Sequence, residues 1–416
     1  MEEQAAVVVV AEKSLTFMPY QALWMPFSHR FVVLGAFPHA TGVIQMYSLL
    51  PPSASASSPS SATFSLHKDK EVEKQAGFRC GTFEASTYEE RHLATGDFQG
   101  RLAIWDLEKP TVPVYTVAKA HEGIINAIDG CGGGTTTGKP SYPDERVTEQ
   151  HGSGSYAPEI VTGGRDGVVA LWDPRQKRKP VGKLLLTDNT NTKRDCWCVR
   201  FVNLFHDEEK EENKAQKSDR YVLCGYNDGA MCVWDLRKNS ILWHNQHQSS
   251  KNNKGICSID FYHNNDINAK ANAKKEAKVL VSTEDNDCFV YDVGSVFFGE
   301  EAGRSSDQTS NTDNMQTFNT QQGTVWCGKF FPSQQRRQRE AEQELMFLTT
   351  GGDGSIAIQR MRNAEEQQNK EGMMKKQPLA DQPIISFDWN RSHRGLGLFA
   401  CLNNTVQVVQ VVASAT

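Results

Sequence analysis

Histidine, aspartate and cysteine residues are the first candidates for chemistry in this chain. His121 and Asp166 could form the base-and-carboxylate pair with which many hydrolases move a proton. Cys196 and Cys198 lie in one expected strand and are unsuitable as a pair of metal ligands, and the ten cysteines form no CxxC pair. The sequence therefore predicts no metal site.

Motifs for covalent, phosphate or metal catalysis are absent from the sequence. There is no GxxxxGK[ST], no GxSxG and no HExxH. The glycine-rich segments GGRDGVVALW and TTGGDGS are expected to join antiparallel strands and to open no helix, so no helix dipole is available for a phosphate. We therefore expect no enzyme activity and no cofactor.

The elements that position these residues are short hairpins. Residues 159–175, EIVTGGRDGVVALWDPR, place two β-branched runs around a glycine-rich turn, which is typical of a hairpin. The pattern recurs seven times, with a glycine or asparagine five places before the end of the second strand. These turn anchors are Gly42, Gly100, Gly167, Gly229, Asn286, Gly354 and Asn404.

A second pattern precedes most hairpins and indicates one more strand in each repeat. It consists of an apolar residue, a second apolar or small residue three places later and an aromatic residue two places after that, as in Cys196-Val199-Phe201 and Ile256-Ile259-Phe261. With room for a fourth strand, each unit matches a β-propeller blade.

We predict an all-β fold: one seven-bladed β-propeller over residues 1–416. The last unit lacks a fourth strand, and the apolar strand at 6–11 stands before the first blade, so pairing the two would close the ring. The expected blades cover residues 15–50, 76–110, 121–178, 194–243, 254–295, 322–361 and 382–412.

Long polar insertions separate the repeats, which lie farther apart than the about 40–45 residues of a standard WD repeat. The hairpin turns stay short, so one face of the blades is expected to be lean and the other to carry much of the inserted sequence. None of the insertions has the apolar periodicity of a core. They cover residues 53–62, 131–155, 206–219, 264–278, 300–316, 334–344 and 362–376.

Composition limits the partners and the compartment. The net charge is −5 with both signs mixed along the chain, so nucleic-acid and membrane partners are not indicated. The apolar run in the N-terminal segment is too short for a signal peptide or a membrane span. Most cysteines lie in apolar runs, which is typical of a thiol-reduced protein, and we expect a cytoplasmic location.

The third unit resembles a WD repeat in its polar residues as well as in its turn. A histidine precedes the inner strand, a hydroxyl lies in the first hairpin strand, an aspartate lies in the turn and a tryptophan follows. The resemblance implies an internal hydrogen-bond chain across the blade, which we prefer to a catalytic pair. Its members are His121, Thr162, Asp166 and Trp172.

More specific blocks resemble the Monad family of WD-repeat dynein axonemal assembly factors. They include LATGDFQGRLAIWDLE, HEGIINAIDG, APEIVTGGRDGVVALWDPRQK and KRDCWCVRF, and the similarity runs through all seven blades. The resemblance implies a non-catalytic co-chaperone adaptor. It would work with the RuvB-like ATPase and prefoldin-like complex during cytoplasmic preassembly of axonemal dynein arms, as a monomeric propeller within a larger complex.

Residues at the lean face are the candidates for partner binding, because tryptophan and arginine are enriched in interface hot spots. They lie at the starts of inner strands and at hairpin turns. The alternative for Trp197 and Trp326 is packing between blades. The candidates are Arg79, Phe98, Arg165, Arg194, Asp195, Trp197, Tyr226, Trp326 and Asp353.

A second function remains open on the opposite face. Trp172-Asp173-Pro174-Arg175 and Trp234-Asp235-Leu236-Arg237 resemble the docking motif of substrate receptors for cullin-RING ubiquitin ligases. In that interpretation Arg175 and Arg237 bind the ligase adaptor. The structural alternative is an arginine that caps a turn at the end of its strand.

Overall fold

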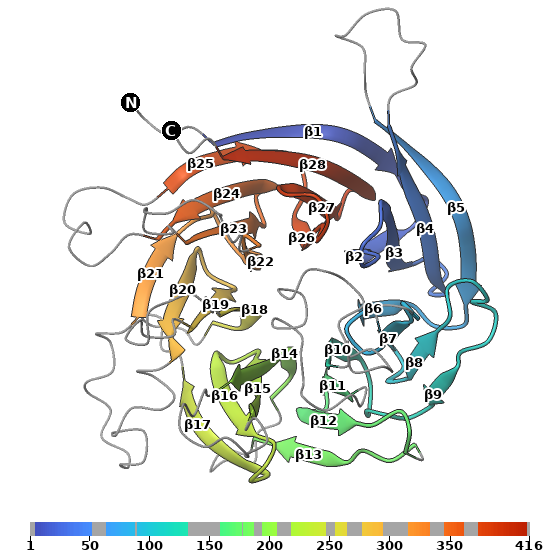
Figure 1. Cartoon of the computed structure of the whole chain (residues 1–416), viewed down its shortest axis with the longest axis vertical. Coiled ribbons are helices and arrows are strands. Elements are labelled where there is room, and N and C mark those ends of the chain that lie inside the picture. Colours follow the sequence, from blue (N-terminus) through green and yellow to red (C-terminus); the bar gives the residue numbers. More distant parts are fainter. Residues whose placement is uncertain are drawn as a thin grey trace, which may run out of the picture. The chain divides into compact units, whose positions relative to one another are not determined.

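Seven four-stranded antiparallel sheets make up the described part of the chain (Figure 1). The computed structural model describes residues 5–51, 64–87, 90–131, 159–176, 178–186, 194–205, 218–246, 254–263, 277–293, 315–332, 345–361 and 373–413. The elements within these ranges are all strands. The predicted all-β propeller class with seven blades is therefore confirmed, while most of the polar insertions fall outside the described residues.

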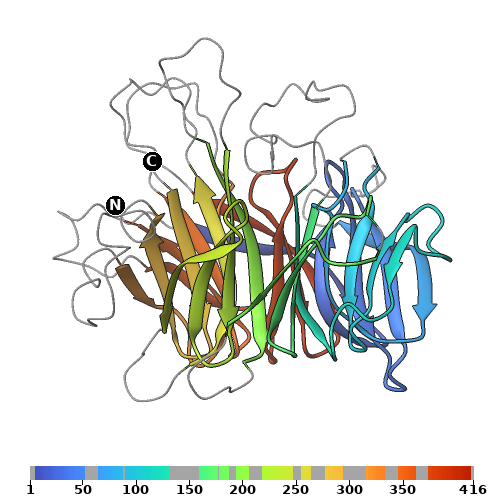
Figure 2. The same cartoon turned by 90° about the horizontal axis from the view of Figure 1, so that it is seen from below.

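The strands group into two compact units. Unit 1 comprises Met1–Phe78, Leu280–Phe289 and Thr317–Thr416, and unit 2 comprises Arg79–Val279 and Val290–Gln316. Figure 2 shows the strands of unit 2, coloured cyan to yellow-green, running up and down in alternation. We number the blades from 1 to 7 in chain order.

Blades 1, 6 and 7 belong to unit 1. Blade 1 has the order β2 (Met18–Trp24), β3 (Arg30–Ala36), β4 (Gly42–Leu50) and β5 (Ser65–Lys74). Blade 6 has the order β22 (Val325–Phe330), β23 (Met346–Gly351), β24 (Ser355–Arg360) and β25 (Met373–Pro378). Blade 7 has the order β26 (Ile384–Trp389), β27 (Leu396–Cys401), β28 (Thr405–Ala413) and β1 (Ala5–Ser14).

Blades 2, 3 and 4 belong to unit 2. Blade 2 has the order β6 (Phe78–Thr82), β7 (Leu93–Asp97), β8 (Leu102–Trp105) and β9 (Tyr115–Val117). Blade 3 has the order β10 (Ile125–Cys131), β11 (Glu159–Gly164), β12 (Val168–Trp172) and β13 (Gly182–Leu185). Blade 4 has the order β14 (Cys196–Phe205), β15 (Ser218–Tyr226), β16 (Ala230–Asp235) and β17 (Ser240–Gln246).

Blade 5 follows the same order of strands. It consists of β18 (Ile256–His263), β19 (Ala277–Thr283), β20 (Asp287–Asp292) and β21 (Met315–Asn319).

The N-terminal strand completes blade 7, as predicted. β1 pairs antiparallel with β28, from Ala5 opposite Ala413 to Ser14 opposite Thr405. Val7 is buried in the apolar cluster that includes Val411, whereas Val8 on the other face is exposed. Period-two alternation thus anchors one face of the strand.

Turn chemistry explains most of the hairpins. Five of the seven predicted anchors have positive φ angles, from +61° to +80°, the conformation in which glycine and asparagine cost least: Gly100, Gly167, Gly229, Gly354 and Asn404. Gly42 and Asn286 are not among the residues with positive φ. In blade 1 Ala40 has a φ of 68°, and Gly42 is instead required because a Cβ there would overlap the Ala76 carbonyl oxygen.

The fourth strands extend beyond the predicted blade boundaries in blades 1 to 6. β5, for example, lies wholly after residue 50, and β25 lies wholly after residue 361. These outermost strands are short or polar and carry no repeated anchor. The single-domain organisation over 1–416 stays a prediction.

Candidate interaction surface

A β-bulge lies near the start of each of five inner strands, three in unit 1 and two in unit 2. The pairing register shifts across the second residue of β14 and of β22, which are the sites of Trp197 and Trp326. The same shift occurs at Tyr20 in β2, Asn126 in β10 and Ile385 in β26. All five side chains are partly exposed. Because a bulge re-aims its residue out of the ladder, it presents these side chains at the blade's rim.

Tyr20, Asn126 and Ile385 were missed as surface residues by sequence reasoning. A signal was available, because Asn126 and Ile385 directly follow Ile125 and Ile384, the first apolar residues of the inner-strand pattern. Asn126 also connects two blades, since its Nδ2 donates to the Cys196 carbonyl oxygen at 3.1 Å.

Trp197 is held between blades 4 and 5 and keeps part of its ring exposed. A Cβ built on Gly255 would lie 2.5 Å from a carbon atom of the Trp197 ring, so the indole lies directly on the glycine backbone. Gly255 immediately precedes β18. The packing alternative for Trp197 thus holds, while its role in partner binding stays a prediction for a residue that is half-buried.

Arg165 and Asp195 connect the turn of blade 3 to the start of blade 4. The Arg165 Nε lies 3.9 Å from the Asp195 Oδ2, with 65% of the arginine side chain exposed. Burial raises the pKa of Asp195, and the charge of Arg165 opposes that increase. A long, solvent-exposed pair of this kind contributes little stability, so the guanidinium can exchange Asp195 for a partner's carboxylate.

Arg194 is engaged within its own blade. Its Nε lies 2.9 Å from the Asp228 Oδ2, and 13% of its side chain is exposed. The adjacent backbone is fixed by Asn227, whose Oδ1 accepts from the Asp195 amide at 2.9 Å and whose amide donates to the Asp195 carbonyl oxygen at 3.0 Å. Arg194 therefore orders the start of β14 rather than presenting a free charge.

Tyr226 is not a surface residue, which corrects the prediction. Its side chain has no exposed area, and it packs in the apolar cluster that includes Trp234 and Val222. Burial, with nearby thiols including Cys232, raises the pKa of the Tyr226 phenol well above its usual range. Tyr226 ends β15 opposite Cys196, and there its side chain points into the core.

Asp353 lies at a turn, and its carboxylate forms hydrogen bonds and an ion pair within its own blade. It accepts from the Ser355 amide at 3.0 Å and the Ser355 hydroxyl at 2.6 Å, and it pairs with Lys376 at 2.9 Å. Burial would raise the pKa of Asp353, yet these hydrogen bonds lower it on balance. Its role in the described structure is to hold the turn.

Arg79 and Phe98 are partly exposed in unit 2.

The polar residues of blade 3 form a continuous hydrogen-bond chain. His121 Nδ1 lies 2.9 Å from Asp166 Oδ1, and His121 Nε2 lies 2.7 Å from Thr162 Oγ1. The Trp172 indole donates to the same threonine oxygen at 2.8 Å. The two ring nitrogens of His121 thus connect the Asp166 carboxylate to the Thr162 hydroxyl, which also lies 3.5 Å from the Ala170 carbonyl oxygen.

This chain has the order of a catalytic triad without its accessibility. Thr162 is fully buried, and the Trp172 ring above it is 1% exposed. A nucleophile must reach its substrate, and here the hydroxyl is enclosed by the tryptophan and the strand backbone. The arrangement stabilises the blade.

The two Trp-Asp-x-Arg segments form ordinary strand-end turns. The Arg175 side chain binds Asp173 through two hydrogen bonds of 3.0 Å and 2.8 Å, and its amide donates to the same carboxylate at 2.9 Å. The Arg237 amide donates to Asp235 at 2.9 Å, and its side chain is exposed. Each motif thus has a local structural role.

The residues that the structure describes hold no group of three or more His, Cys, Asp or Glu side chains arranged to bind a metal ion. Among these residues, no helix has the length and apolar character to cross a membrane.

Repeated four-stranded blades, an N-terminal strand that completes the last blade and the His-Thr-Asp-Trp chain define a WD-repeat β-propeller. A β-propeller family model described as "Nucleolar protein 10-like, N-terminal domain" matches residues 148–327. Dynein axonemal assembly factor 10 of Bos taurus and that of Homo sapiens are each 32% identical to this chain, over 98% of it and 97% of their own length. The Chlamydomonas reinhardtii protein of that name is 31% identical over 97% of this chain and 95% of its own. The chain belongs to the dynein axonemal assembly factor 10 family.

Proposed function

We propose that this chain is a non-catalytic adaptor in the cytoplasmic preassembly of axonemal dynein arms. It binds the RuvB-like ATPase and prefoldin-like co-chaperone complex and holds dynein chains while they assemble. The observation that carries the proposal is the similarity to assembly factors along nearly the whole chain, in organisms as distant as Homo sapiens and Chlamydomonas reinhardtii.

The surface that supports this role lies in unit 2. The Trp197 ring is rigidly seated yet partly exposed, and the exposed guanidinium of Arg165 lies where blade 3 meets blade 4. A fixed aromatic ring and an exposed arginine are the residue types most enriched in interface hot spots. The Trp326 ring, at the equivalent bulge of unit 1, is a further candidate.

Affinity capture of the tagged chain from cells building cilia tests the proposal. Wild type should recover RuvB-like ATPases, prefoldin subunits and dynein heavy chains, and the Arg165→Ala/Trp197→Ala variant should lose most of that recovery. Arg165→Ala/Trp197→Ala is preferred to a substitution of Arg194, whose ion pair with Asp228 orders the strand. Full recovery by a folded double variant would contradict the proposed surface, and absence of chaperones from the wild-type sample would contradict the function.

A role as a ubiquitin-ligase substrate receptor stays a prediction. In the same capture, Arg175→Ala/Arg237→Ala should abolish recovery of a cullin adaptor if the two arginines dock it. Unchanged recovery would remove that role, and the variant also serves as a matched control for Arg165→Ala/Trp197→Ala.

A further inference from the structure

The end of blade 3 at which β12 leads into β13 carries exposed positive charges. Arg178 and Lys179 lie in the turn, Lys183 lies in β13, and all three are exposed. Among the residues that the structure describes, no carboxylate forms an ion pair with any of the three. Arg175 differs from them, because its guanidinium donates to Asp173 at 3.0 Å and 2.8 Å. The other three charges are therefore available to a partner.

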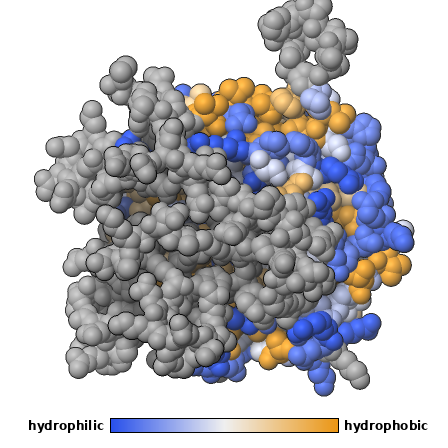
Figure 3. Space-filling view, viewed as in Figure 1, coloured by the Kyte–Doolittle hydropathy of each residue, from blue (hydrophilic) through white to orange (hydrophobic). Residues whose placement is uncertain are grey.

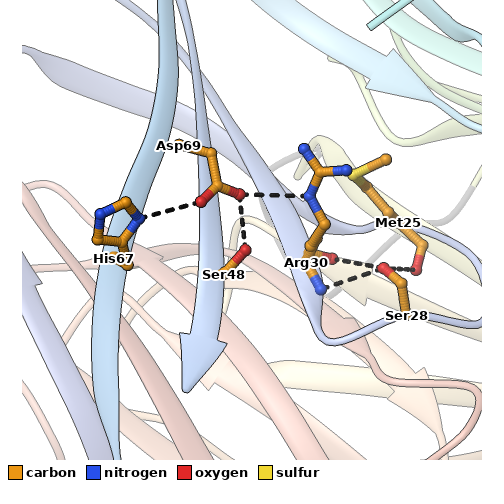
Figure 4. Close-up of polar contacts among 6 residues, drawn as sticks. All are labelled: Met25, Ser28, Arg30, Ser48, His67 and Asp69. Atoms are coloured by element: carbon orange, nitrogen blue, oxygen red, sulfur yellow. Dashed lines mark hydrogen bonds and ion pairs between the residues drawn. The ribbon is translucent and has the colours of Figure 1, made fainter. Parts of the chain in front are cut away.

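Two arginines in neighbouring parts of the fold show the contrast. In blade 1, the Arg30 Nε donates to Asp69 of β5 at 3.2 Å (Figure 4). In unit 2, the Arg200 Nη1 of β14 donates to Asp129 of β10 at 3.4 Å. Figure 3 shows strongly hydrophilic residues at the lower right, where the β12–β13 turn lies in Figure 1. This turn is thus locally positive in a chain whose net charge is −5.

Two exposed apolar side chains accompany these charges. Val181 directly precedes β13 and is 44% exposed, and Leu185 ends the strand and is 54% exposed. Lys183 lies between them and is also exposed, whereas Leu184 is buried, which is the period-two alternation of a strand with one face in the core. The outer face of β13 therefore presents an apolar, a basic and an apolar side chain in a row.

The free edge of β13 limits which partner can bind. β13 is the outermost strand of its sheet, and it pairs with β12 and with no other strand in the described part of the chain. Lys183 is the kind of charge that prevents edge-to-edge association, so a second copy of this chain is disfavoured. An acidic strand would neutralise that charge, and its backbone could pair with the open edge. A nucleic acid or a lipid headgroup has no such backbone.

We propose that residues 178–185 dock an extended segment of a protein partner, in which acidic residues alternate with apolar ones. Its carboxylates pair with the three basic side chains, and its apolar side chains cover the two exposed apolar ones. Its backbone extends the sheet of blade 3 beyond β13. The surface lies at the opposite end of β12 from Arg165, so it is separate from the surface of the proposed function.

Fluorescence anisotropy with the full-length chain tests the docking surface directly. The probe is the labelled peptide EETVTETVTEE, whose pattern is the same in both strand directions. At low salt it should bind more tightly than QQTVTQTVTQQ, which lacks the charges, and than EETVPEPVTEE, whose prolines oppose strand pairing. Binding should weaken about tenfold in Arg178→Gln/Lys179→Gln/Lys183→Gln, since each exposed ion pair contributes modestly.

Further variants and probes locate the binding. Val181→Thr/Leu185→Thr should weaken it severalfold, whereas Arg165→Gln, at the other end of blade 3, should leave it unchanged. Hydrogen exchange should slow in residues 182–185 when EETVTETVTEE is bound. Equal affinity for the Glu and Gln peptides, no binding of the Glu peptide, or unchanged exchange in β13 would each overturn the proposal. Tighter binding of an oligouridylate or of phosphatidylserine vesicles through the same three charges would overturn it as well.

Discussion

At the scale of single residues, Thr162 is the centre of the polar chain in blade 3. Its oxygen accepts the Trp172 indole proton, and its hydroxyl contacts His121. Thr162→Val keeps the shape and leaves two buried polar groups without partners, so we expect a loss of about 3 kcal/mol in the free energy of unfolding. Urea denaturation followed by tryptophan fluorescence measures it.

Thr95 provides the matched control for that substitution. It also accepts an indole proton, from Trp105 at 2.8 Å, but the described contacts of its hydroxyl include no histidine. Thr95→Val should therefore cost about 1–2 kcal/mol. If Thr162→Val cost no more than Thr95→Val, His121 would add nothing to the stability of its blade.

The carboxylate of Asp166 predicts a dependence of stability on pH. Burial would raise its pKa, but the hydrogen bond and charge of His121 lower the pKa on balance. A carboxyl with a lower pKa in the folded chain stabilises it above its unfolded pKa of about 4 and loses that effect as the pH falls through the folded value. The difference in urea midpoint between wild type and Asp166→Asn should therefore shrink between pH 6 and pH 3. A constant difference would contradict this assignment.

Single residues also show where sequence reasoning succeeds and fails. His121, Thr162, Asp166 and Trp172 are found together because each has a fixed place in the repeat. The burial of Tyr226 could not be predicted from its place before a turn, because the direction of that side chain depends on the register of β15 with β14.

At the scale of elements, the approach of a strand to the turn that follows a neighbouring strand limits the side chains. A Cβ on Gly130 in β10 would overlap the backbone of Glu84 and Ala85. Gly130→Ala should therefore destabilise the chain by about 2–3 kcal/mol, because backbone cannot move aside as a flexible side chain can. Thermal unfolding followed by circular dichroism measures the effect.

Gly352 is the control for Gly130. The nearest atom to a Cβ on Gly352 is the Thr324 amide nitrogen at 3.5 Å, which is an ordinary contact. Gly352→Ala should change stability by less than about 0.5 kcal/mol. Equal effects of the two substitutions would show that the approach of the turn at Glu84 and Ala85 to Gly130 is not limiting.

Hairpins are the elements that the sequence specifies best. Glycine or asparagine in each turn and apolar residues on both sides are local signals, and they place the two central strands of every blade. The outermost strands and the bulges at Trp197 and Trp326 depend on the register with which each strand pairs with its neighbour. The fourth strands carry no repeated anchor, so they extend beyond the predicted boundaries.

At the scale of the whole molecule, stability depends on pairing between the first and last strands of the chain. Val7→Asp would put a charge into the cluster around Val411 and should cost about 3 kcal/mol or more. Val8→Asp, one residue away on the exposed face, should cost about 1 kcal/mol or less. Guanidinium denaturation of both variants compares them. Similar losses would contradict the observed register of β1.

The propeller class and the strand that completes blade 7 could be predicted because seven copies of one pattern leave a strand unpaired at each end. Partners could not be predicted from the repeat, because the repeat specifies packing and leaves the surface free. The proposal about partners therefore rests on similarity to the assembly factors and on the exposed residues at the bulges.

Complementation of a ciliated cell line that lacks its own dynein axonemal assembly factor 10 tests the central claim most directly. The cells would express this chain, and quantitative mass spectrometry would measure dynein heavy chains in isolated axonemes. An adaptor for dynein preassembly should restore most of the heavy chains with wild type and few with Arg165→Ala/Trp197→Ala at equal expression. Axonemes that stay depleted of heavy chains while the wild-type protein is folded and abundant would contradict the claim.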